Sequence, residues 1–180
     1  LAQFNTIIVS GLAYGIDICA HKAALKYGLP TWAVFAHGHD IIYPSSHTNV
    51  ANEILNSGAL LSDYISKTKP ERQNFPSRNR IIAGLSDATI VIESANRGGS
   101  LITANIANSY NREVFAMPGK PKDEKSAGCN YLIKTQRAVL LESIDDIIRE
   151  LNWDAKTKQN NVRQKLLIEL SNDERRLLNI

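Results

Sequence analysis

The chain has 180 residues, of which 43% are hydrophobic and 22% charged, and its formal net charge is +3. This length suits one main domain with its own core plus a short appendage, and this composition excludes a disordered or fibrous protein. No run of 18 apolar residues and no signal-peptide pattern is present, and the two cysteines lack CxxC spacing. We therefore expect a cytoplasmic protein without a membrane span, and nucleic-acid binding must be argued from local clusters of charge.

Short apolar runs alternate along the chain with segments of helical period. This alternation predicts βαβ units and a doubly wound α/β fold with a mostly parallel sheet. The predicted strands are Thr6–Ser10, Thr31–Ala36, Ala59–Ser62, Ala88–Glu93, Glu113–Met117 and Ala138–Leu141. The predicted helices are Ile16–Tyr27, Thr48–Ser57, Ser77–Leu85, Leu101–Tyr110, Asn130–Lys134 and Ile144–Leu151.

Domain boundaries follow from shifts in composition. Residues 1–152 form the predicted main domain, and almost nothing precedes its first strand, so we expect a further strand and helix before it. The polar residues 153–161 predict a linker. Residues 162–180 return to helical apolar spacing and are interpreted as the start of a second domain.

The loop from Ser10 to Gly15 follows a strand and opens a helix, and Gly11 would let the backbone approach a phosphate. The loop is not GxGxxG, and the second strand ends in Ala36 and His37 rather than in an acid that could bind a ribose. A nicotinamide dinucleotide is therefore not expected, and no other cofactor is indicated.

Asp17 and His21 lie four residues apart on one helix face. They are either an acid/base or metal pair or structural residues, with the acid favouring the helix dipole and the histidine satisfying a nearby backbone group. The residues 37–40, His-Gly-His-Asp, offer no second ligand group at a recognised zinc spacing, so no metal is expected.

Pro76 predicts an extended entry into a helix that Ser77 caps, and this helix begins with Arg78 and Arg80. Arginine at a helix start opposes the helix dipole, which suggests an anionic partner such as a phosphate. The alternative is an internal ion pair of either arginine with Asp63 or Glu93.

A glycine-rich turn follows the fourth predicted strand. Ser100 is expected to cap the next helix, leaving the amides of residues 101–103 for an anion, with the Thr103 hydroxyl and Arg97 nearby. Gly98 and Gly99 complete this loop. The alternative is a capping turn without a ligand.

Several motifs, taken in order, resemble the DNA-processing protein A (DprA/Smf) family. They are Ser-Gly-Leu-Ala-Tyr-Gly-Ile-Asp at 10–17, Phe-Pro-Ser-Arg-Asn-Arg at 75–80 with its continuation to 86, Gly-Ser-Leu-Ile-Thr-Ala at 99–104, Arg-Glu-Val-Phe-Ala-Met-Pro-Gly at 112–119 and Gly-Cys-Asn-Tyr-Leu-Ile at 128–133.

The resemblance implies an extended Rossmann-like fold that binds single-stranded DNA without turnover, forms a homodimer and helps load a RecA-type recombinase during natural transformation. The resemblance also implies that the DNA pocket is formed by Gly99, Ser100, Leu101 and Thr103. Arg78 and Arg80 would supply positive charge to the same face. The resemblance also makes residues 162–180 similar to the start of a winged-helix domain.

Three departures from the family pattern stand out. The arginine of a Val-Gly-Ser-Arg-like turn would precede this chain. Residues 136–138 are Gln-Arg-Ala where the family has Gly-Ala, and Ala104 replaces a lysine found in some relatives.

A competing interpretation is an enzyme, a nucleoside-monophosphate phosphoribohydrolase of the lysine-decarboxylase-like (LOG) group. That group needs a glutamate in the loop equivalent to residues 97–104, where this sequence has no acid. We therefore expect a binding protein rather than an enzyme. Only Phe75 and Tyr14 are identified as aromatic side chains near the site, so base stacking is expected to be limited.

Overall fold

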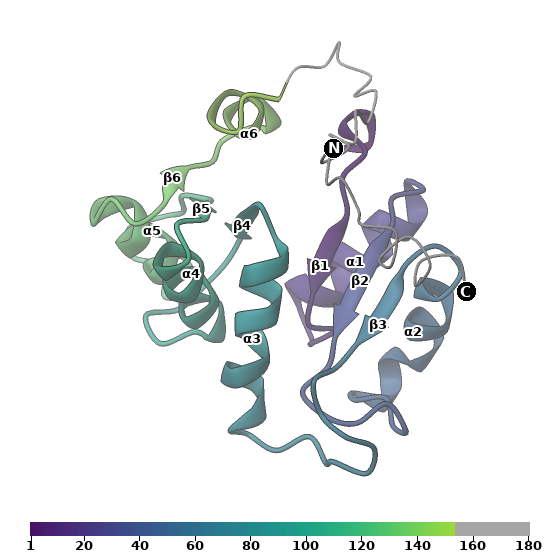
Figure 1. Cartoon of the computed structure of the whole chain (residues 1–180). Coiled ribbons are helices and arrows are strands. Elements are labelled where there is room, and N and C mark those ends of the chain that lie inside the picture. The colour runs from purple at the N-terminus through teal and green to yellow at the C-terminus, as the bar shows by residue number, and fades with distance from the viewer. Residues whose placement is uncertain (154–180) are drawn as a thin grey trace, which may run out of the picture.

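The computed structural model describes residues 1–153, which fold into alternating strands and helices (Figure 1). The strands are β1 (Ile8–Ser10), β2 (Thr31–Val34), β3 (Ala59–Leu61), β4 (Ala88–Val91), β5 (Glu113–Ala116) and β6 (Val139–Leu140). The α-helices are α1 (Ile16–Lys26), α2 (Thr48–Ile54), α3 (Asn74–Leu85), α4 (Gly99–Ser109), α5 (Ala127–Lys134) and α6 (Ile144–Glu150), and two 3₁₀ turns cover Ala2–Phe4 and Ser45–His47.

The strands form two three-stranded parallel sheets. One has the order β1-β2-β3 and the other β4-β5-β6, so β1 and β4 each have a hydrogen-bonded neighbour on one side only. In the first sheet Ile8 pairs with Thr31 and Trp32 with Ala59, and in the second Ala88 pairs with Glu113. The predicted α/β fold with parallel strands is confirmed, although the described strands form two sheets.

Helix α3 connects the two halves of the molecule. It packs along α4 and also contacts β1 and β2, and Figure 1 shows it between the two sheets. Each half has its own core, built around Phe35 and Ile54 in the first and around Val91 and Leu132 in the second. A side chain on α3 can therefore reach the carboxyl ends of β1 and β2.

All six predicted strands are present, each shorter by one or two residues at one or both ends. Helix α3, by contrast, begins at Asn74 and not at Ser77. Pro76 lies in its first turn, where a missing N–H costs nothing, and the Ser77 hydroxyl donates to Gln73 O at 3.3 Å instead of capping the helix. Arg78 consequently lies beyond the first turn, so the predicted conflict with the helix dipole is weaker than expected.

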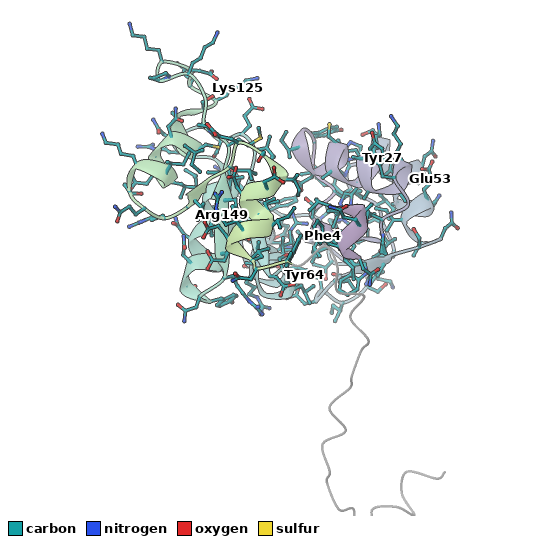
Figure 2. All side chains as sticks on the ribbon, turned by 90° about the horizontal axis from the view of Figure 1, so that it is seen from above. Phe4, Tyr27, Glu53, Tyr64, Lys125 and Arg149 are labelled. Atoms are coloured by element: carbon teal, nitrogen blue, oxygen red, sulfur yellow. The ribbon has the colours of Figure 1, made fainter. Side chains whose placement is uncertain are left out.

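The C-terminal predictions fall mostly outside the described residues. The linker and the winged-helix-like segment lie there, except for Trp153, whose ring centroid is 5.3 Å from that of Phe4. Within residues 1–153, no helix combines the length and apolar character needed to cross a bilayer. The side chains of these residues are drawn in Figure 2.

Candidate nucleic-acid interface

The loop between β1 and α1 is held by side chains from three helical elements. Leu12 has a φ of 57° and Gly15 a φ of 85°, which turn the chain sharply into α1. Asp17 Oδ2 accepts hydrogen bonds from the amides of Gly11 at 2.9 Å and Ala13 at 3.3 Å. The backbone amide of Gly11, where close approach of a phosphate is predicted, is therefore already occupied by a carboxylate of the same chain.

Arg78, on α3, contacts the same loop with its buried guanidinium group. Its side chain is 4% exposed, and Nη1 donates to Gly11 O at 3.0 Å and to Val34 O. Burial lowers the pKa of the Arg78 guanidinium, while the nearby Asp17 carboxylate raises it. Within residues 1–153 no acidic side chain lies within 4.0 Å of Arg78, so the neutral carbonyls at the ends of β1 and β2 solvate its charge.

His21 is fully buried beneath this loop. The Thr31 hydroxyl donates to Ile8 O at 2.8 Å, so His21 Nδ1–H donates to the Thr31 oxygen at 2.7 Å and leaves Nε2 as a buried acceptor without a partner among the described residues. Burial lowers the pKa of His21 to about 4, with Arg78 and His47 adding to the effect and Asp17 opposing it. The sequence left two possibilities for Asp17 and His21, a catalytic or metal-binding pair or two structural residues. Their contacts in the folded chain are structural ones.

His47 is a residue of this cluster that the sequence did not indicate. Its Nδ1 donates to Leu12 O at 2.8 Å from the turn before α2, 35 residues away. No local motif marks such a long-range contact. Together, Asp17, Arg78 and His47 use the amides of Gly11 and Ala13 and the carbonyls of Gly11 and Leu12.

Arg80 forms the ion pair that the sequence left as an alternative. Its Nη2 lies 2.6 Å from Asp63 Oδ2, and both side chains are partly exposed. Such surface pairs are worth less than about 1 kcal/mol and exchange readily. A phosphate contact by Arg80 remains a prediction, and it would replace Asp63.

The two glycines before α4 have different surroundings. A Cβ on Gly98 would lie 2.3 Å from Ser94 Oγ, so the Ser94 side chain would have to move to admit a side chain there. Apart from its chain neighbours and the backbone of its own helix, no atom of residues 1–153 would lie within 4 Å of a Cβ on Gly99, and the φ of Gly99 is not in the left-handed region. Nothing in the described structure requires glycine at position 99, and the space beside it is open.

Gly98 takes the capping position of α4, and no side chain caps this helix. The predicted cap by Ser100 is therefore wrong, because Ser100 is already the second helical residue. Its hydroxyl and that of Thr103 make no hydrogen bond to any other described residue, and nor do the amides of Gly99 and Ser100. Unpaired donors and the positive end of the helix dipole converge here.

Arg97 supplies an exposed positive charge beside these donors. It has no acidic partner within 4.0 Å in the part of the chain that the structure describes. A cavity of about 460 Å³ includes Asn96, Arg97 and residues 121–124 of the loop after β5. Hydrogen bonds from Ser94 N to Lys125 O and from Gly128 N to Ser94 O hold that loop against the turn before α4, and Figure 2 shows Lys125 on a projecting part of the molecule.

Apart from Arg80, which pairs with Asp63, the predicted site residues fall into two groups. Gly11 and Arg78 meet at the ends of β1 and β2, whereas Arg97 and residues 98–103 surround the start of α4, and no hydrogen bond links the groups directly. The rings of His37 and His39 lie beside Phe35, with centroids 4.8 Å and 5.9 Å from its ring. Residues 1–153 contain no cluster of three histidine, cysteine or acidic side chains that could hold a metal.

The fold is that of an α/β protein of the Rossmann type, in which donors at the start of α4 have no partner among residues 1–153. A sequence profile of the family described as DNA recombination-mediator protein A matches residues 1–152. The chain belongs to this family, whose members are DNA-binding recombination mediators rather than enzymes.

Relatives in several bacteria support this assignment. Protein Smf of Synechocystis is 47% identical over 141 residues, covering 78% of this chain and 35% of the relative. DNA processing protein DprA of Streptococcus pneumoniae is 44% identical over 147 residues, covering 82% of this chain and 52% of the relative. The chain therefore spans about half or less of the length of these relatives.

Two solved structures resemble the chain. The X-ray structure of DprA from Streptococcus pneumoniae gives a TM-score of 0.75 at 42% identity, covering 82% of this chain and 52% of that one. The second is a structure of DprA from Helicobacter pylori, whose description concerns its single-stranded DNA binding mode. It gives a TM-score of 0.73 at 32% identity, covering 81% of this chain and 66% of that one. The fold predicted from the motifs is confirmed.

Proposed function

We propose that this protein binds single-stranded DNA at the start of α4 and, as a homodimer, helps load a RecA-type recombinase onto the strand during natural transformation. The observation that carries the DNA-binding part is the open space at Gly99 beside unpaired donors. A glycine that folding does not need is explained by the close approach of a ligand to the backbone.

In this proposal a phosphate binds the amides of Gly99 and Ser100 and is contacted by the hydroxyls of Ser100 and Thr103. The exposed Arg97 guanidinium neutralises it or the next phosphate along the strand. Gly98 and Leu101 shape the turn. These contacts are to the sugar-phosphate backbone, so they carry no base specificity.

The two groups of residues then have different tasks. Arg78 and Gly11 act from the loop between β1 and α1, where the buried guanidinium adds positive potential without an acidic partner in residues 1–153. Arg80 can contact the strand only if a phosphate replaces Asp63 as its ion-pair partner. Arg97 is therefore the arginine best placed for direct contact.

The biological part of the proposal rests on family membership. The Helicobacter pylori protein, to which the chain is 32% identical, is described as binding single-stranded DNA. Recombinase loading, dimerisation and transformation are carried over from the family resemblance. They concern the whole protein, of which this chain corresponds to a part.

Fluorescence anisotropy tests the DNA-binding part. The wild type is titrated with a labelled single-stranded oligonucleotide, the corresponding duplex and AMP at several salt concentrations. Arg97→Ala is compared with Arg112→Ala, which removes the same charge at the amino end of β5, where Arg112 pairs with Asp87 at 3.6 Å. Each lost phosphate contact lowers the salt slope by about 0.7 for a single strand.

We expect the single strand to bind best and Arg97→Ala alone to reduce affinity and slope. If the two substitutions had equal effects, the binding would depend on the overall charge of the protein, and the proposed site at the start of α4 would be wrong. Preferential AMP binding with release of adenine would instead establish the phosphoribohydrolase alternative.

A further inference from the structure

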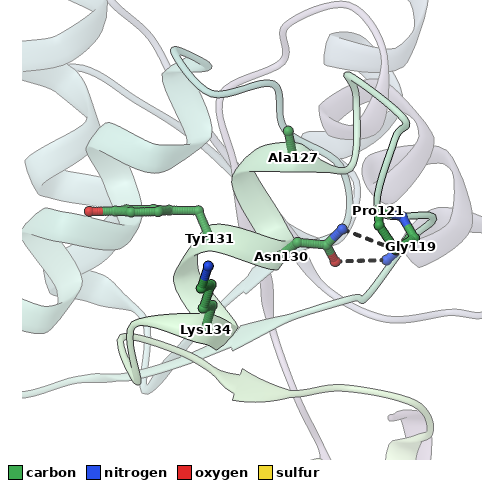
Figure 3. A pocket seen from close by; sticks show the side chains of 6 residues that line it. All are labelled: Gly119, Pro121, Ala127, Asn130, Tyr131 and Lys134. Carbon is green, nitrogen blue, oxygen red and sulfur yellow. Dashed lines mark hydrogen bonds between the residues drawn. The ribbon is translucent and has the colours of Figure 1, made fainter.

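A second cavity runs along one exposed face of α5. Its volume is about 500 Å³, within the range of small-molecule sites, and its lining comes from α5 and from the loop after β5. The helical lining residues are Ala127, Asn130, Tyr131 and Lys134, whose spacing of three, four and seven residues places them on one helix face (Figure 3). The opposite wall is formed by Gly119 and Pro121.

Asn130 fixes the distance between these two walls. Its Nδ2 donates to Gly119 O at 3.0 Å, and its Oδ1 accepts from Gly119 N at 3.1 Å, the two dashed lines in Figure 3. This pair preforms the cavity. It also occupies the amide that could have read the edge of a base, so the lining offers little for base-specific recognition.

Tyr131 and Lys134 remain as available groups. The Tyr131 side chain is 48% exposed and extends from α5 on the side opposite Gly119, with its hydroxyl outermost in Figure 3. Lys134 lies one turn further along the helix, is exposed and has no acidic partner within 4.0 Å among residues 1–153. An aromatic ring and an ammonium group without an acidic partner among residues 1–153, both on one face of α5, match a base and its phosphate.

This cavity adjoins the candidate interface. It shares Pro121 and Ala127 with the cavity that contains Asn96 and Arg97. A strand bound at the start of α4 can therefore continue across Pro121 onto α5 without leaving the surface of the protein.

We propose that the α5 cavity is a nucleotide subsite for a single DNA strand, in which a base stacks on Tyr131 and the adjacent phosphate pairs with Lys134. The subsite rests on the proposed function, because it extends the same strand. It accepts any base, since its contacts are a ring face and a charge.

The test compares Tyr131→Ala with Tyr110→Ala in the whole chain. Tyr110 is also 48% exposed but follows α4 beside Gly84, so it matches Tyr131 in type and exposure. Affinity for labelled oligonucleotides is measured together with the fluorescence of single 2-aminopurine substitutions, which is quenched by stacking. Urea unfolding of each variant shows that the fold is retained, and Tyr131→Phe keeps the ring as a rescue.

We expect Tyr131→Ala to weaken single-strand affinity by about 5- to 100-fold, as loss of one stacked base does, with Tyr131→Phe and Tyr110→Ala near the wild type. One 2-aminopurine position loses its quenching in Tyr131→Ala only, and Lys134→Gln lowers the salt slope by about 0.7. If the wild type binds the strand and Tyr131→Ala binds it equally well, the subsite is wrong and the α4 site stands. If the wild type binds no single strand, both proposals are overturned.

Discussion

Replacing Gly11 with alanine is expected to destabilise the protein by about 2–4 kcal/mol. The added Cβ would lie 2.5 Å from Arg78 Nη2 and 2.6 Å from its Cζ, so the guanidinium must move. An arginine end is flexible, but here movement breaks its hydrogen bonds to Gly11 O and Val34 O inside the protein. Hydrogen bonds of a charged group are worth about 1.5–3 kcal/mol each, and partial loss of two gives the expected range.

Gly99→Ala is the matched control for this substitution. Among residues 1–153, no atom outside its own helix backbone and its chain neighbours would lie within 4 Å of the added Cβ, and alanine is favoured over glycine in a helix by up to about 1 kcal/mol. Gly99→Ala should therefore keep or slightly raise stability while lowering single-strand affinity, because the methyl group occupies the space proposed for the phosphate. Gly11→Ala, in contrast, should lower the free energy of unfolding.

Urea unfolding followed by circular dichroism measures both variants, with midpoints compared at an unchanged m value. The reasoning about Arg78 is refuted if Gly11→Ala unfolds at the wild-type midpoint. It is also refuted if Gly99→Ala is destabilised as much as Gly11→Ala. Wild-type DNA affinity of a stable Gly99→Ala variant would contradict the phosphate position.

Three further predictions concern single side chains. Arg80→Ala should change stability by less than about 1 kcal/mol, since the pair with Asp63 is partly exposed; unchanged strand affinity in anisotropy titrations would remove Arg80 from the site. His21 binds a proton near pH 6.5 when unfolded but only near pH 4 when folded, so its contribution is complete above pH 6.5 and is lost on acidification, by on the order of 3 kcal/mol at pH 4. Urea midpoints from pH 7 to 4 should fall less steeply in His21→Gln, and parallel curves would count against the assignment. Ser143→Ala should cost about 1 kcal/mol in the same unfolding assay, because Ser143 and Asp146 form a capping box at α6, and a wild-type midpoint would show that the cap contributes nothing.

The six strands were predictable because strands buried in parallel sheets appear as short apolar runs between helical segments. β5 is an example, with Val114, Phe115 and Ala116 all buried. Helix starts were less predictable. Pro76 and Ser100 are compatible both with the residue before a helix and with its first turn, and only the hydrogen bonds of the folded chain distinguish these positions.

The candidate site was predicted by residue type and only in part by role. Arginine at position 78 signals a positive charge, but the sequence contains no information on whether that charge faces solvent or the carbonyl of Val34. The same holds for the glycines. Gly11 and Gly99 look alike in a motif, yet a Cβ would meet Arg78 at one position and open space at the other.

Tyr131 shows what sequence reasoning missed. The spacing of residues 127, 130, 131 and 134 marks one helix face, but the predicted helix began only at Asn130, which hid the pattern. Stacking was therefore expected only from Phe75 and Tyr14, whereas the folded chain adds an exposed aromatic ring beside the loop after β5.

The amino-acid sequence by itself determined the α/β class, the family and the two glycine-containing loops, because these depend on local periodicity and on the order of motifs. Tertiary structure alone decided which polar groups remain free for a ligand. That outcome depends on contacts between distant residues, such as Arg78 with Gly11 and His47 with Leu12, which use the polar groups of one loop. At the start of α4, by contrast, no such contact from residues 1–153 is made.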